Sequence, residues 1–237
     1  MSKRAIILAG GKGTRLRPYT VVLPKPLMPI QDCSILEIII KQLALQGFDH
    51  ITLAVNHQAD IIKALFGDGK KWNIYIDYSL EEKSLSTIGP LKLIKDLPQN
   101  FLVMNGDILC DLKYGEFFEY HEKFQNIFTI SSYRRDHLVD YGVLEINQLG
   151  KLQNFREKPV LSYEVSMGVY MVHKEILTFV PDGQPYGFDN LMADLLDKKR
   201  PPTVKRHEGY WLDIGRPEDY MQAIEQFETL SSHFFYE

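Results

Sequence analysis

The sequence has few cysteines, no long apolar run and no excess of basic residues, and each of these absences excludes a class of protein. Only Cys33 and Cys110 occur in 237 residues, too few for a disulfide framework and without the paired spacing of a zinc site. The formal net charge is -4, so no basic field attracts nucleic acid or an anionic membrane. The first apolar run, Ala5 to Ala9, is too short for a signal peptide, and no later run approaches a membrane span. We therefore expect a globular cytoplasmic protein with neither nucleic acid nor a membrane as partner.

Histidine pairs and internal repeats are also missing. The 7 histidines form no His-x-x-x-His or His-Cys group, which gives no support to zinc or histidine-based chemistry. The sequence has no periodic repeat and no low-complexity segment, so solenoid and fibrous architectures are excluded.

The first half of the chain alternates short β-branched runs with amphipathic stretches. This order predicts strands joined by helices in a mostly parallel sheet of an α/β fold. The expected strands are Ala5–Ala9, Ile51–Asn56, Ile74–Tyr78 and Phe101–Asn105, and the expected helices are Ser34–Gln46, Ala59–Phe66 and Pro90–Asp96. Loops 10–29, 79–89 and 106–112 follow these strands, so they should share the edge at which open α/β sheets bind ligands.

The second half of the chain has a different sequence pattern, with short strands separated by turns. Short strands are expected at Tyr141–Ile146, Lys151–Arg156 and Val165–Val172, and helices within Asp189–Asp197 and from Pro217 to about Leu230. We expect residues 1–237 to form a single domain, in which residues 1–133 make the first part and residues 134–237 add a smaller mixed lobe over the ligand edge and a last helix.

The most informative segment follows the first strand. Residues 8–18 read Leu-Ala-Gly-Gly-Lys-Gly-Thr-Arg-Leu-Arg-Pro, and Pro24-Lys25-Pro26 comes soon after. Glycines let backbone N–H groups approach phosphate oxygens, and the flanking prolines restrict the backbone around Lys25. The segment is neither a P-loop nor the dinucleotide fingerprint, because Gly-Lys-Ser/Thr is missing and Leu16 replaces the third glycine. A flexible basic loop is the alternative, but the proline-bracketed lysine favours a polyphosphate site.

The pattern Gly10-Gly11-x-Gly13-Thr14-Arg15-Leu16-x-Pro18, followed by Pro24-Lys25-Pro26, resembles the signature of the sugar-1-phosphate nucleotidyltransferases. The resemblance implies a Rossmann-like, mostly parallel mixed sheet flanked by helices, with the later lobe binding the sugar. It also implies catalytic roles at the triphosphate for Arg15 and Lys25. The nucleotide-binding residues that it implies are Leu8, Gly10, Gly11, Gly13, Thr14, Glu81 and Gly89.

Two acidic residues far apart in the sequence are candidates for a metal site. Asp107 follows the fourth predicted strand, and Asp213 lies in Trp211-Leu212-Asp213-Ile214-Gly215 before the last helix. A nucleoside triphosphate needs a divalent cation, which is usually held by one or two carboxylates with phosphate and water. The resemblance implies that Asp107 and Asp213 hold Mg²⁺. The nearby Asp111 is interpreted instead as the cap of a helix that begins near Lys113.

Short patterns in the second half suggest a sugar-phosphate site. Glu157 can accept hydrogen bonds from sugar hydroxyls, Lys158 can pair with a phosphate, and Gly142 and Gly168 leave room for a ring. Each alone is ordinary, but in this order they resemble the sugar-1-phosphate pocket of the family. The implied partners are a nucleoside triphosphate and a sugar 1-phosphate, and a homo-oligomer is left open.

The choice of base and sugar depends on segment 78–82 and on the loop that follows it. Segment 78–82 (Tyr-Ser-Leu-Glu-Glu) resembles that of mannose- and heptose-1-phosphate guanylyltransferases, which favours GTP and a mannose- or heptose-like sugar. Ser86 and Ile88 depart from the usual Leu-Gly-Thr-Ala/Gly-Gly pattern, so thymidylyl, uridylyl and cytidylyl transfer stay open. A regulatory protein that binds a nucleotide sugar without turnover is a further alternative. No hexapeptide-repeat domain is expected after the last helix.

Overall fold

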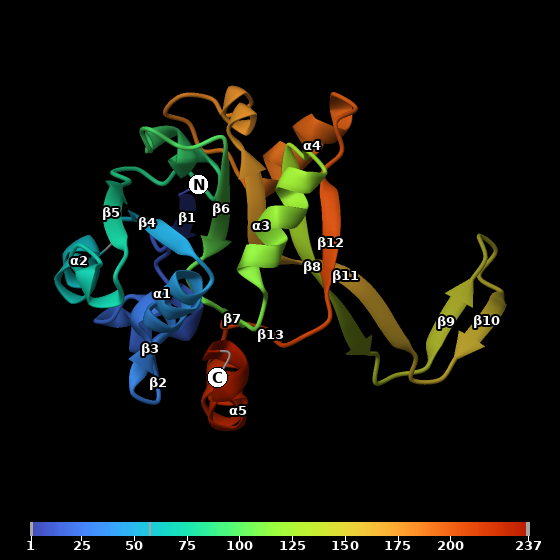
Figure 1. Ribbon diagram of the computed structural model, residues 1–237. Coiled ribbons are helices and arrows are strands. Elements are labelled where there is room, and N and C mark those ends of the chain that lie inside the picture. Colours follow the sequence, from blue (N-terminus) through green and yellow to red (C-terminus); the bar gives the residue numbers. More distant parts are fainter. Residues whose placement is uncertain (1, 57, 236–237) are drawn as a thin grey trace.

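The computed structural model describes residues 2–56 and 58–235. Its centre is a 7-stranded sheet in the order β12-β8-β11-β6-β1-β4-β5 (Figure 1). These strands are β1 (Lys3–Leu8), β4 (Phe48–Val55), β5 (Tyr75–Leu80), β6 (Asn100–Asn105), β8 (Phe128–Leu138), β11 (Val160–His173) and β12 (Thr203–His207). Strand β1 pairs in parallel with β4 and β6, and β4 pairs in parallel with β5, whereas β11 runs antiparallel between β6 and β8. The expected mostly parallel mixed sheet is confirmed.

Three small antiparallel sheets accompany the central one. They pair β2 (Pro29–Ile30) with β3 (Cys33–Ser34), β7 (Ile108–Cys110) with β13 (Trp211–Asp213), and β9 (Val143–Ile146) with β10 (Leu152–Arg156). The helices are α1 (Ile35–Leu45), α2 (Ala59–Phe66), α3 (Tyr114–Lys123), α4 (Phe188–Asp197) and α5 (Pro217–Phe235). Short 3-10 turns lie at η1 (Thr14–Leu16), η2 (Tyr19–Val21), η3 (Lys25–Leu27), η4 (Lys70–Trp72), η5 (Gly89–Leu93) and η6 (Lys174–Thr178).

Both faces of the central sheet are buried. Successive side chains of a strand point to opposite faces, and in β1 Ile7 joins one apolar core while Ile6 joins the other. Helices α1, α2, α3 and α5 contribute to the first core, and η5, η6 and α4 contribute to the second. Burial on both faces explains why Ala5–Leu8 of β1 form a continuous apolar run instead of an alternating one.

Helix α1 begins as its sequence predicts. Ser34 is its N-cap, and the Ser34 Oγ accepts a hydrogen bond from the Glu37 N–H at 3.1 Å. This bond satisfies one of the N–H groups that a helix start leaves unpaired, so the cap fixes where α1 begins.

Two helix predictions were wrong in detail. The segment expected as a helix from Pro90 to Asp96 is the 3-10 turn η5. At its start the N–H groups of Ile88 and Gly89 both donate hydrogen bonds to the Tyr186 carbonyl, and at its end Asp96 has a left-handed backbone (φ 55°) that stops a helix. Asp111 does not cap α3, whose N-cap is Lys113 without a side-chain bond. Asp111 instead accepts a hydrogen bond of 2.7 Å from the Tyr210 N–H.

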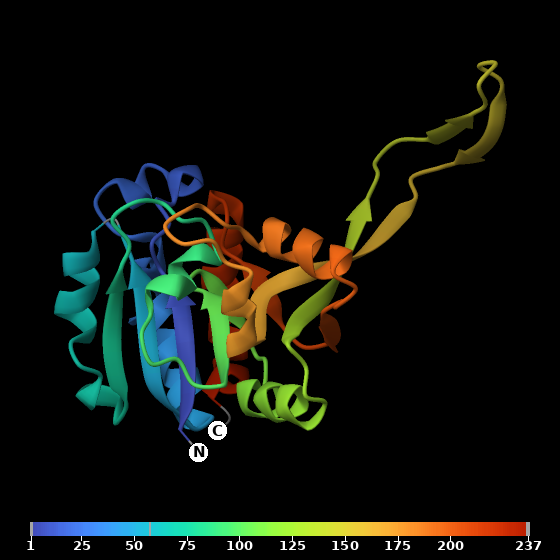
Figure 2. The ribbon, with the colours of Figure 1, turned by 90° about the horizontal axis from the view of Figure 1, so that it is seen from above.

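The second half differs from the expected lobe over the ligand edge. Strands β8, β11 and β12 extend the central sheet, and the predicted boundary at residue 133 falls inside β8. Residues 134–164, which we call the arm, continue from β8 and β11 as a two-stranded stem and end in the β9–β10 hairpin. Figures 1 and 2 both show the arm projecting away from the body of the molecule.

Candidate functional site

The loop after β1 is held closed by contacts that only glycine permits. Gly13 has a left-handed backbone (φ 58°), and a Cβ on it would lie 3.0 Å from the Thr20 Cγ2 and 3.1 Å from the Lys25 Cβ. The Thr20 hydroxyl donates a 2.7 Å hydrogen bond to the Gly13 carbonyl. Lys25 is buried between Pro24 and Pro26, which are buried too. The loop therefore positions its lysine rigidly, as the bracketing prolines predict.

The paired strands β7 and β13 bring the two candidate metal ligands together. In this sheet Asp213 lies opposite Ile108, the residue after Asp107. The Ile214 N–H also donates a 3.1 Å hydrogen bond to the Asp107 carbonyl. This pairing places Asp213 beside Asp107 at the carboxyl end of β6.

The charges at this point are closely coupled. The Lys25 ammonium forms an ion pair with the Asp107 carboxylate. The pKa of Asp213 is raised above its ordinary value, first because the group is buried and then because the negative charge of Asp107 is near. Lys25 and Arg15 oppose this rise, which shows that both cations lie close enough to act on Asp213. A buried carboxylate whose pKa is raised in this way is stabilised in its charged form by a further cation.

The donor set fits a hard divalent cation. The Asp107 Oδ1 is buried and has no hydrogen-bond partner among the residues that the structure describes. Over the same residues, no group of three or more His, Cys, Asp and Glu side chains could hold a metal. Mg²⁺ keeps several waters and often takes only one or two protein carboxylates with substrate oxygens, so this pair satisfies its usual requirement.

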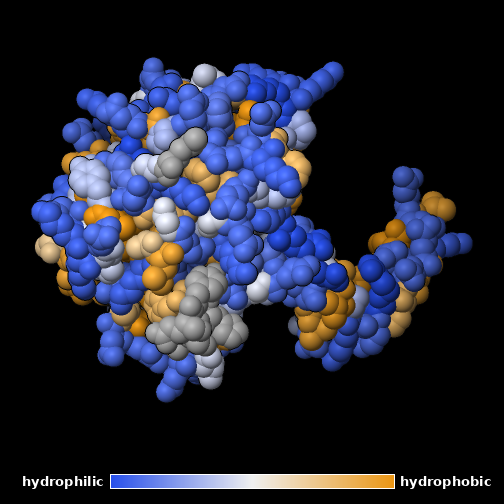
Figure 3. Space-filling model, in the orientation of Figure 1, coloured by the Kyte–Doolittle hydropathy of each residue, from blue (hydrophilic) through white to orange (hydrophobic). Residues whose placement is uncertain are grey.

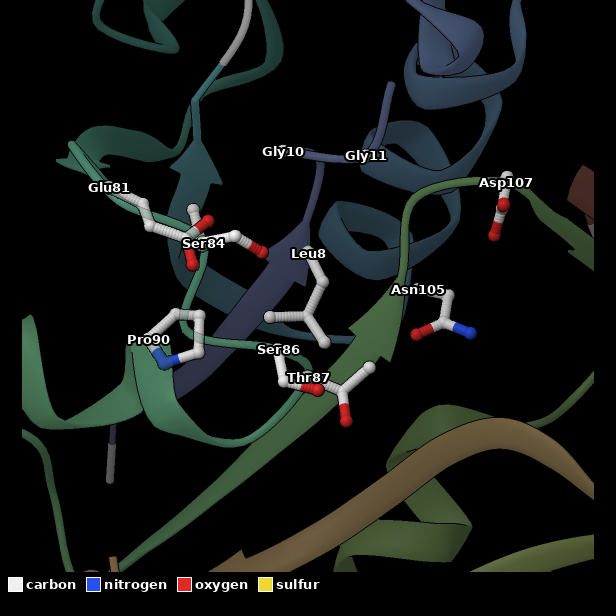
Figure 4. A pocket seen from close by; sticks show the side chains of 11 residues that line it. Leu8, Gly10, Gly11, Glu81, Ser84, Ser86, Thr87, Pro90, Asn105 and Asp107 are labelled. Carbon is white, nitrogen blue, oxygen red and sulfur yellow. The ribbon is translucent and has the colours of Figure 1, made fainter. Parts of the chain in front are cut away.

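A pocket of about 330 Å³ opens beside these residues (Figure 4). Its lining comes from the carboxyl ends of β1, β4 and β6 and from the segments that follow β1, β5 and β6. The lining residues are Leu8, Gly10, Gly11, Ala54, Glu81, Ser84, Ser86, Thr87, Pro90, Asn105 and Asp107. Pockets of this size and position are typical ligand sites of open α/β sheets.

Four residues predicted for the nucleotide thus line one pocket: Leu8, Gly10, Gly11 and Glu81. A Cβ on Gly10 would lie 3.3 Å from the Glu81 Oε2, so glycine keeps this part of the pocket open. The Glu81 carboxylate accepts a hydrogen bond from the Leu85 N–H and so orders the loop after β5. Gly89 is buried just behind the lining, where its N–H bonds to the Tyr186 carbonyl at 2.9 Å.

The two unusual residues of this loop have different surroundings. Ile88 is fully buried in the second apolar core and does not line the pocket. Ser86 lines the pocket and has a left-handed backbone (φ 68°), a conformation that glycine adopts most readily. The family pattern has glycine at this position, so the serine keeps the loop shape and adds a hydroxyl to the pocket.

The candidate sugar residues are divided between two places. Gly142, Glu157 and Lys158 lie together on the arm, where a Cβ on Gly142 would lie 3.1 Å from the Glu157 Oε2. Lys158 is exposed and pairs with Asp140 at 2.9 Å. Gly168 lies on the body, where its Cβ position is 2.6 Å from the Asn105 Nδ2. None of the described residues that line the pocket comes from the arm.

The sequence reasoning missed several residues of the pocket. Asn105 and Thr87 contribute polar side chains to its lining and Pro90 contributes apolar surface (Figure 4). Ala54 adds further apolar surface. The position of Asn105 as the last residue of a strand, directly before Gly106-Asp107, was a usable signal. Thr87 had none, because its place depends on the fold of the loop after β5.

Comparison with known proteins gives the family. A family model described as Nucleotidyl transferase matches residues 4–229. The chain belongs to the nucleotidyl transferase family. A UTP--glucose-1-phosphate uridylyltransferase of Synechocystis is 34% identical over 93% of the chain and 62% of the relative. A mannose-1-phosphate guanyltransferase of Aspergillus oryzae is 32% identical over 93% of the chain and 63% of the relative. This chain therefore spans just over three fifths of the length of these curated relatives.

Solved structures agree with the fold of this chain. HddC from Yersinia pseudotuberculosis, complexed with GMP-PN, is 29% identical with a TM-score of 0.73, and the match covers 95% of this chain and 99% of HddC. A putative glucose-1-phosphate thymidylyltransferase from Bacillus anthracis has a TM-score of 0.75 at 21% identity, with 94% of each chain covered, which supports the fold alone. Within the described residues, no helix is long and apolar enough to cross a membrane.

Proposed function

We propose that this nucleotidyl transferase joins a nucleoside monophosphate from a nucleoside triphosphate to a sugar 1-phosphate and releases pyrophosphate. The observation that carries the proposal is that Lys25, Asp107 and Asp213 lie together beside a pocket lined by Gly10 and Gly11 of the loop after β1. Mannose, glucose and nucleotide ligands in the names of the relatives support the substrate class. We further propose that the reaction takes place in the cytoplasm, because both cysteines are free.

In this mechanism the sugar phosphate oxygen attacks the α-phosphorus in line, the new P–O bond forms and the bond to pyrophosphate breaks. A phosphate monoester has a second pKa of about 6, so the nucleophile is already ionised and needs no general base. The protein therefore acts by positioning and charge stabilisation. Mg²⁺, held by Asp107 and Asp213, would neutralise phosphate charge when bound.

The side chains of the site have separate tasks in this proposal. Lys25 stabilises negative charge at the α-phosphate, and Arg15 stabilises the departing pyrophosphate. Gly11, Gly13 and Thr14 let the loop after β1 present N–H groups to the phosphates. Glu81 and Gly89 shape the part of the pocket that receives the nucleoside. Glu157 and Lys158 bind the sugar hydroxyls and phosphate, and Gly142 and Gly168 belong to the same sugar side, where they pack closely against Phe155 and Asn105.

For the base we propose GTP, and for the sugar a mannose- or heptose-like 1-phosphate. Segment 78–82 supports this choice, as do the guanyltransferase relatives and the complex of HddC with GMP-PN. UTP with glucose 1-phosphate is the second candidate, favoured by the uridylyltransferase at 34% identity. Pyrophosphate release, measured with Mg²⁺ for each triphosphate against each sugar 1-phosphate, separates the two. Binding of nucleotides without release in any combination would contradict both and indicate a regulatory protein.

Replacing Lys25 tests the mechanism directly. Because Lys25→Ala removes the cation proposed at the α-phosphate, we expect turnover to fall by about a hundredfold or more. The control Lys70→Ala removes an exposed lysine that pairs with Asp68 on the surface, and it should leave the rate unchanged. Thermal unfolding of both variants checks folding. A Lys25→Ala protein with near-normal turnover would show that the assignment is wrong.

A further inference from the structure

Asp219, in the first turn of α5, differs from the exposed charges that cover much of the molecule. Figure 3 shows hydrophilic side chains over most of one face of the body, and exposed charges contribute little to a fold because water screens them. Asp219 is only partly exposed. Its Oδ2 accepts hydrogen bonds from the Gly215 N–H at 3.2 Å and from the Arg216 N–H at 2.8 Å. Asp219 therefore fixes the turn that joins β13 to α5.

This turn directly follows the candidate metal ligand Asp213. The Gly215 N–H is shared, since it also donates to the Asp213 carbonyl at 2.9 Å. The Ile214 N–H donates to the Asp107 carbonyl at 3.1 Å. The bonds of Asp219 thus continue into the backbone of both candidate metal ligands. A turn that shifted would move the Asp213 carboxylate relative to that of Asp107.

The same turn lies against Arg15, the cation proposed for the departing pyrophosphate. A Cβ on Gly215 would lie 3.5 Å from the Arg15 Nη1 and 3.5 Å from the Asp219 Oδ2, so both charged groups approach this glycine. Arg15 is exposed and has no ion pair among the residues that the structure describes. Its guanidinium is therefore available to a phosphate, while the turn beside it limits where the guanidinium can lie.

The next residue joins α5 to the loop after β1. Tyr220 is buried, and its hydroxyl donates a 2.6 Å hydrogen bond to the Pro29 carbonyl. Its ring centroid lies 6.1 Å from that of Tyr19. Both partners belong to segment 10–29, which carries the proposed phosphate-binding groups. The first turn of α5 thus contacts the metal side of the site through Asp219 and the phosphate side through Tyr220.

We propose that Asp219 is a positioning residue for nucleotidyl transfer, which fixes turn 214–216 and so keeps Asp213 in place for the metal and Arg15 in place for the pyrophosphate. The inference rests on the proposed function. Both hydrogen bonds use a single oxygen, so the amide oxygen of an asparagine can replace it, whereas alanine cannot. The asparagine variant therefore separates the hydrogen bonds from the charge.

Steady-state kinetics test the proposal. We expect Asp219→Ala to lower kcat by about tenfold or more, the effect typical of losing a residue that supports a metal ligand. Asp219→Asn should stay within about threefold of the natural kcat, because it keeps both hydrogen bonds. Asp68→Ala is the matched control, since it also removes a carboxylate that accepts a backbone N–H, from Lys70 at 3.2 Å, but at an exposed turn. The control should keep the natural rate.

Either of two kinetic results would overturn the proposal. One is an Asp219→Ala protein with the natural kcat, which would show that the site keeps its geometry without these bonds. The other is an Asp219→Asn protein as inactive as Asp219→Ala, which would show that the charge matters and not the hydrogen bonds.

Binding of GTP separates positioning from a purely structural role. Removing a cap lowers the thermal midpoint wherever the helix lies, so a lower midpoint alone proves nothing about the site. By calorimetric titration of GTP with and without Mg²⁺, we expect Mg²⁺ to strengthen binding about tenfold less in Asp219→Ala than in the natural chain. An Asp219→Ala protein that is less stable but responds to Mg²⁺ like the natural chain would show a helix cap only.

The titration requires no turnover, so the two proposals fail separately. If the natural chain releases no pyrophosphate with any substrate pair, the proposed function is wrong, and the titration still decides whether Asp219 positions Asp213.

Discussion

At the scale of single residues, Ser86 replaces the glycine of the family pattern and keeps the backbone conformation that glycine favours. Its φ of 68° lies in the left-handed region, which glycine adopts freely and which strains L-residues other than asparagine and aspartate. The neighbouring loop residues hold this shape, since the Phe188 N–H bonds to the Thr87 hydroxyl at 2.8 Å and the Tyr186 N–H bonds to the Leu85 carbonyl at 2.9 Å. The strain is thus imposed by the fold around the pocket.

Ser86→Gly should remove this strain. We expect the free energy of unfolding to rise by about 1 kcal/mol, because glycine adopts the left-handed conformation without a Cβ clash. Ser84→Gly is the matched control, since Ser84 lines the same pocket and is not among the described residues with positive φ. Glycine there only increases the entropy of the unfolded chain, so stability should fall slightly. Urea denaturation measures both, and a destabilised Ser86→Gly protein would contradict the strain.

At the scale of elements, the packing of α3 on β8 encloses a neutral histidine. His121 of α3 is fully buried, and its Nδ1 lies 2.8 Å from the Thr129 Oγ1 of β8. Burial, and then the nearby His173, lower the pKa of His121 from 6.5 to about 4. The unfolded chain therefore binds this proton more readily than the folded chain does.

A pH dependence of stability follows from that shift. The contribution of neutral His121 is complete above the unfolded pKa of about 6.5 and is lost as the pH falls toward 4, which amounts to as much as about 3 kcal/mol. Because carboxylates also make the stability depend on pH, the natural chain is compared with the His121→Gln variant, whose side chain cannot take up the proton. Urea denaturation at pH 7 and pH 4.5 should show a smaller loss of stability in the variant than in the natural chain. Equal losses would show that His121 does not titrate in this range.

At the scale of the whole molecule, the proposed metal site depends on joining the middle of the chain to its C-terminal part. Asp213 reaches Asp107 only because β13 pairs with β7, and the Trp211 Nε1 anchors this segment by donating to the Met167 carbonyl at 3.1 Å. The arrangement buries the Asp213 carboxyl beside a second carboxylate, and burial first and the negative charge of Asp107 second raise the pKa of Asp213. A site of this kind favours ligand binding over the stability of the empty protein.

Asp213→Asn should separate these two effects. Without Mg²⁺ we expect an equal or higher thermal midpoint, because a buried charge next to Asp107 is removed. We also expect Mg²⁺ to strengthen nucleotide binding at least tenfold less than in the natural chain, because the loss of a residue that only supports a metal ligand already lowers metal affinity by about this factor. Asp182→Asn, at an exposed side chain paired with Lys92, is the control and should change neither. Unaltered Mg²⁺ dependence in the Asp213→Asn protein would exclude Asp213 as a ligand.

The sequence by itself determined the elements whose signals are local. The apolar run of β1, the Ser34 cap of α1, the glycine loop and the rigid Lys25 are consequences of neighbouring residues, and the structure has each where the pattern predicts it. The approximate bounds of β4, β6, α4 and the start of α5 follow from periodicity in the same way. The loops that line the pocket could be predicted too, because the ends of parallel strands meet at one edge, although only some of their lining residues were identified.

Only the tertiary structure decided which distant segments meet. The β7–β13 pair, the antiparallel insertion of β11 between β6 and β8, and the bond between Asp111 and Tyr210 depend on contacts over long stretches of chain. The direction of the arm is of the same kind, since its strands read equally well as a lobe packed on the body. Local patterns fix backbone conformation and which face of a strand is apolar, but the surface that covers that face is chosen by the whole fold.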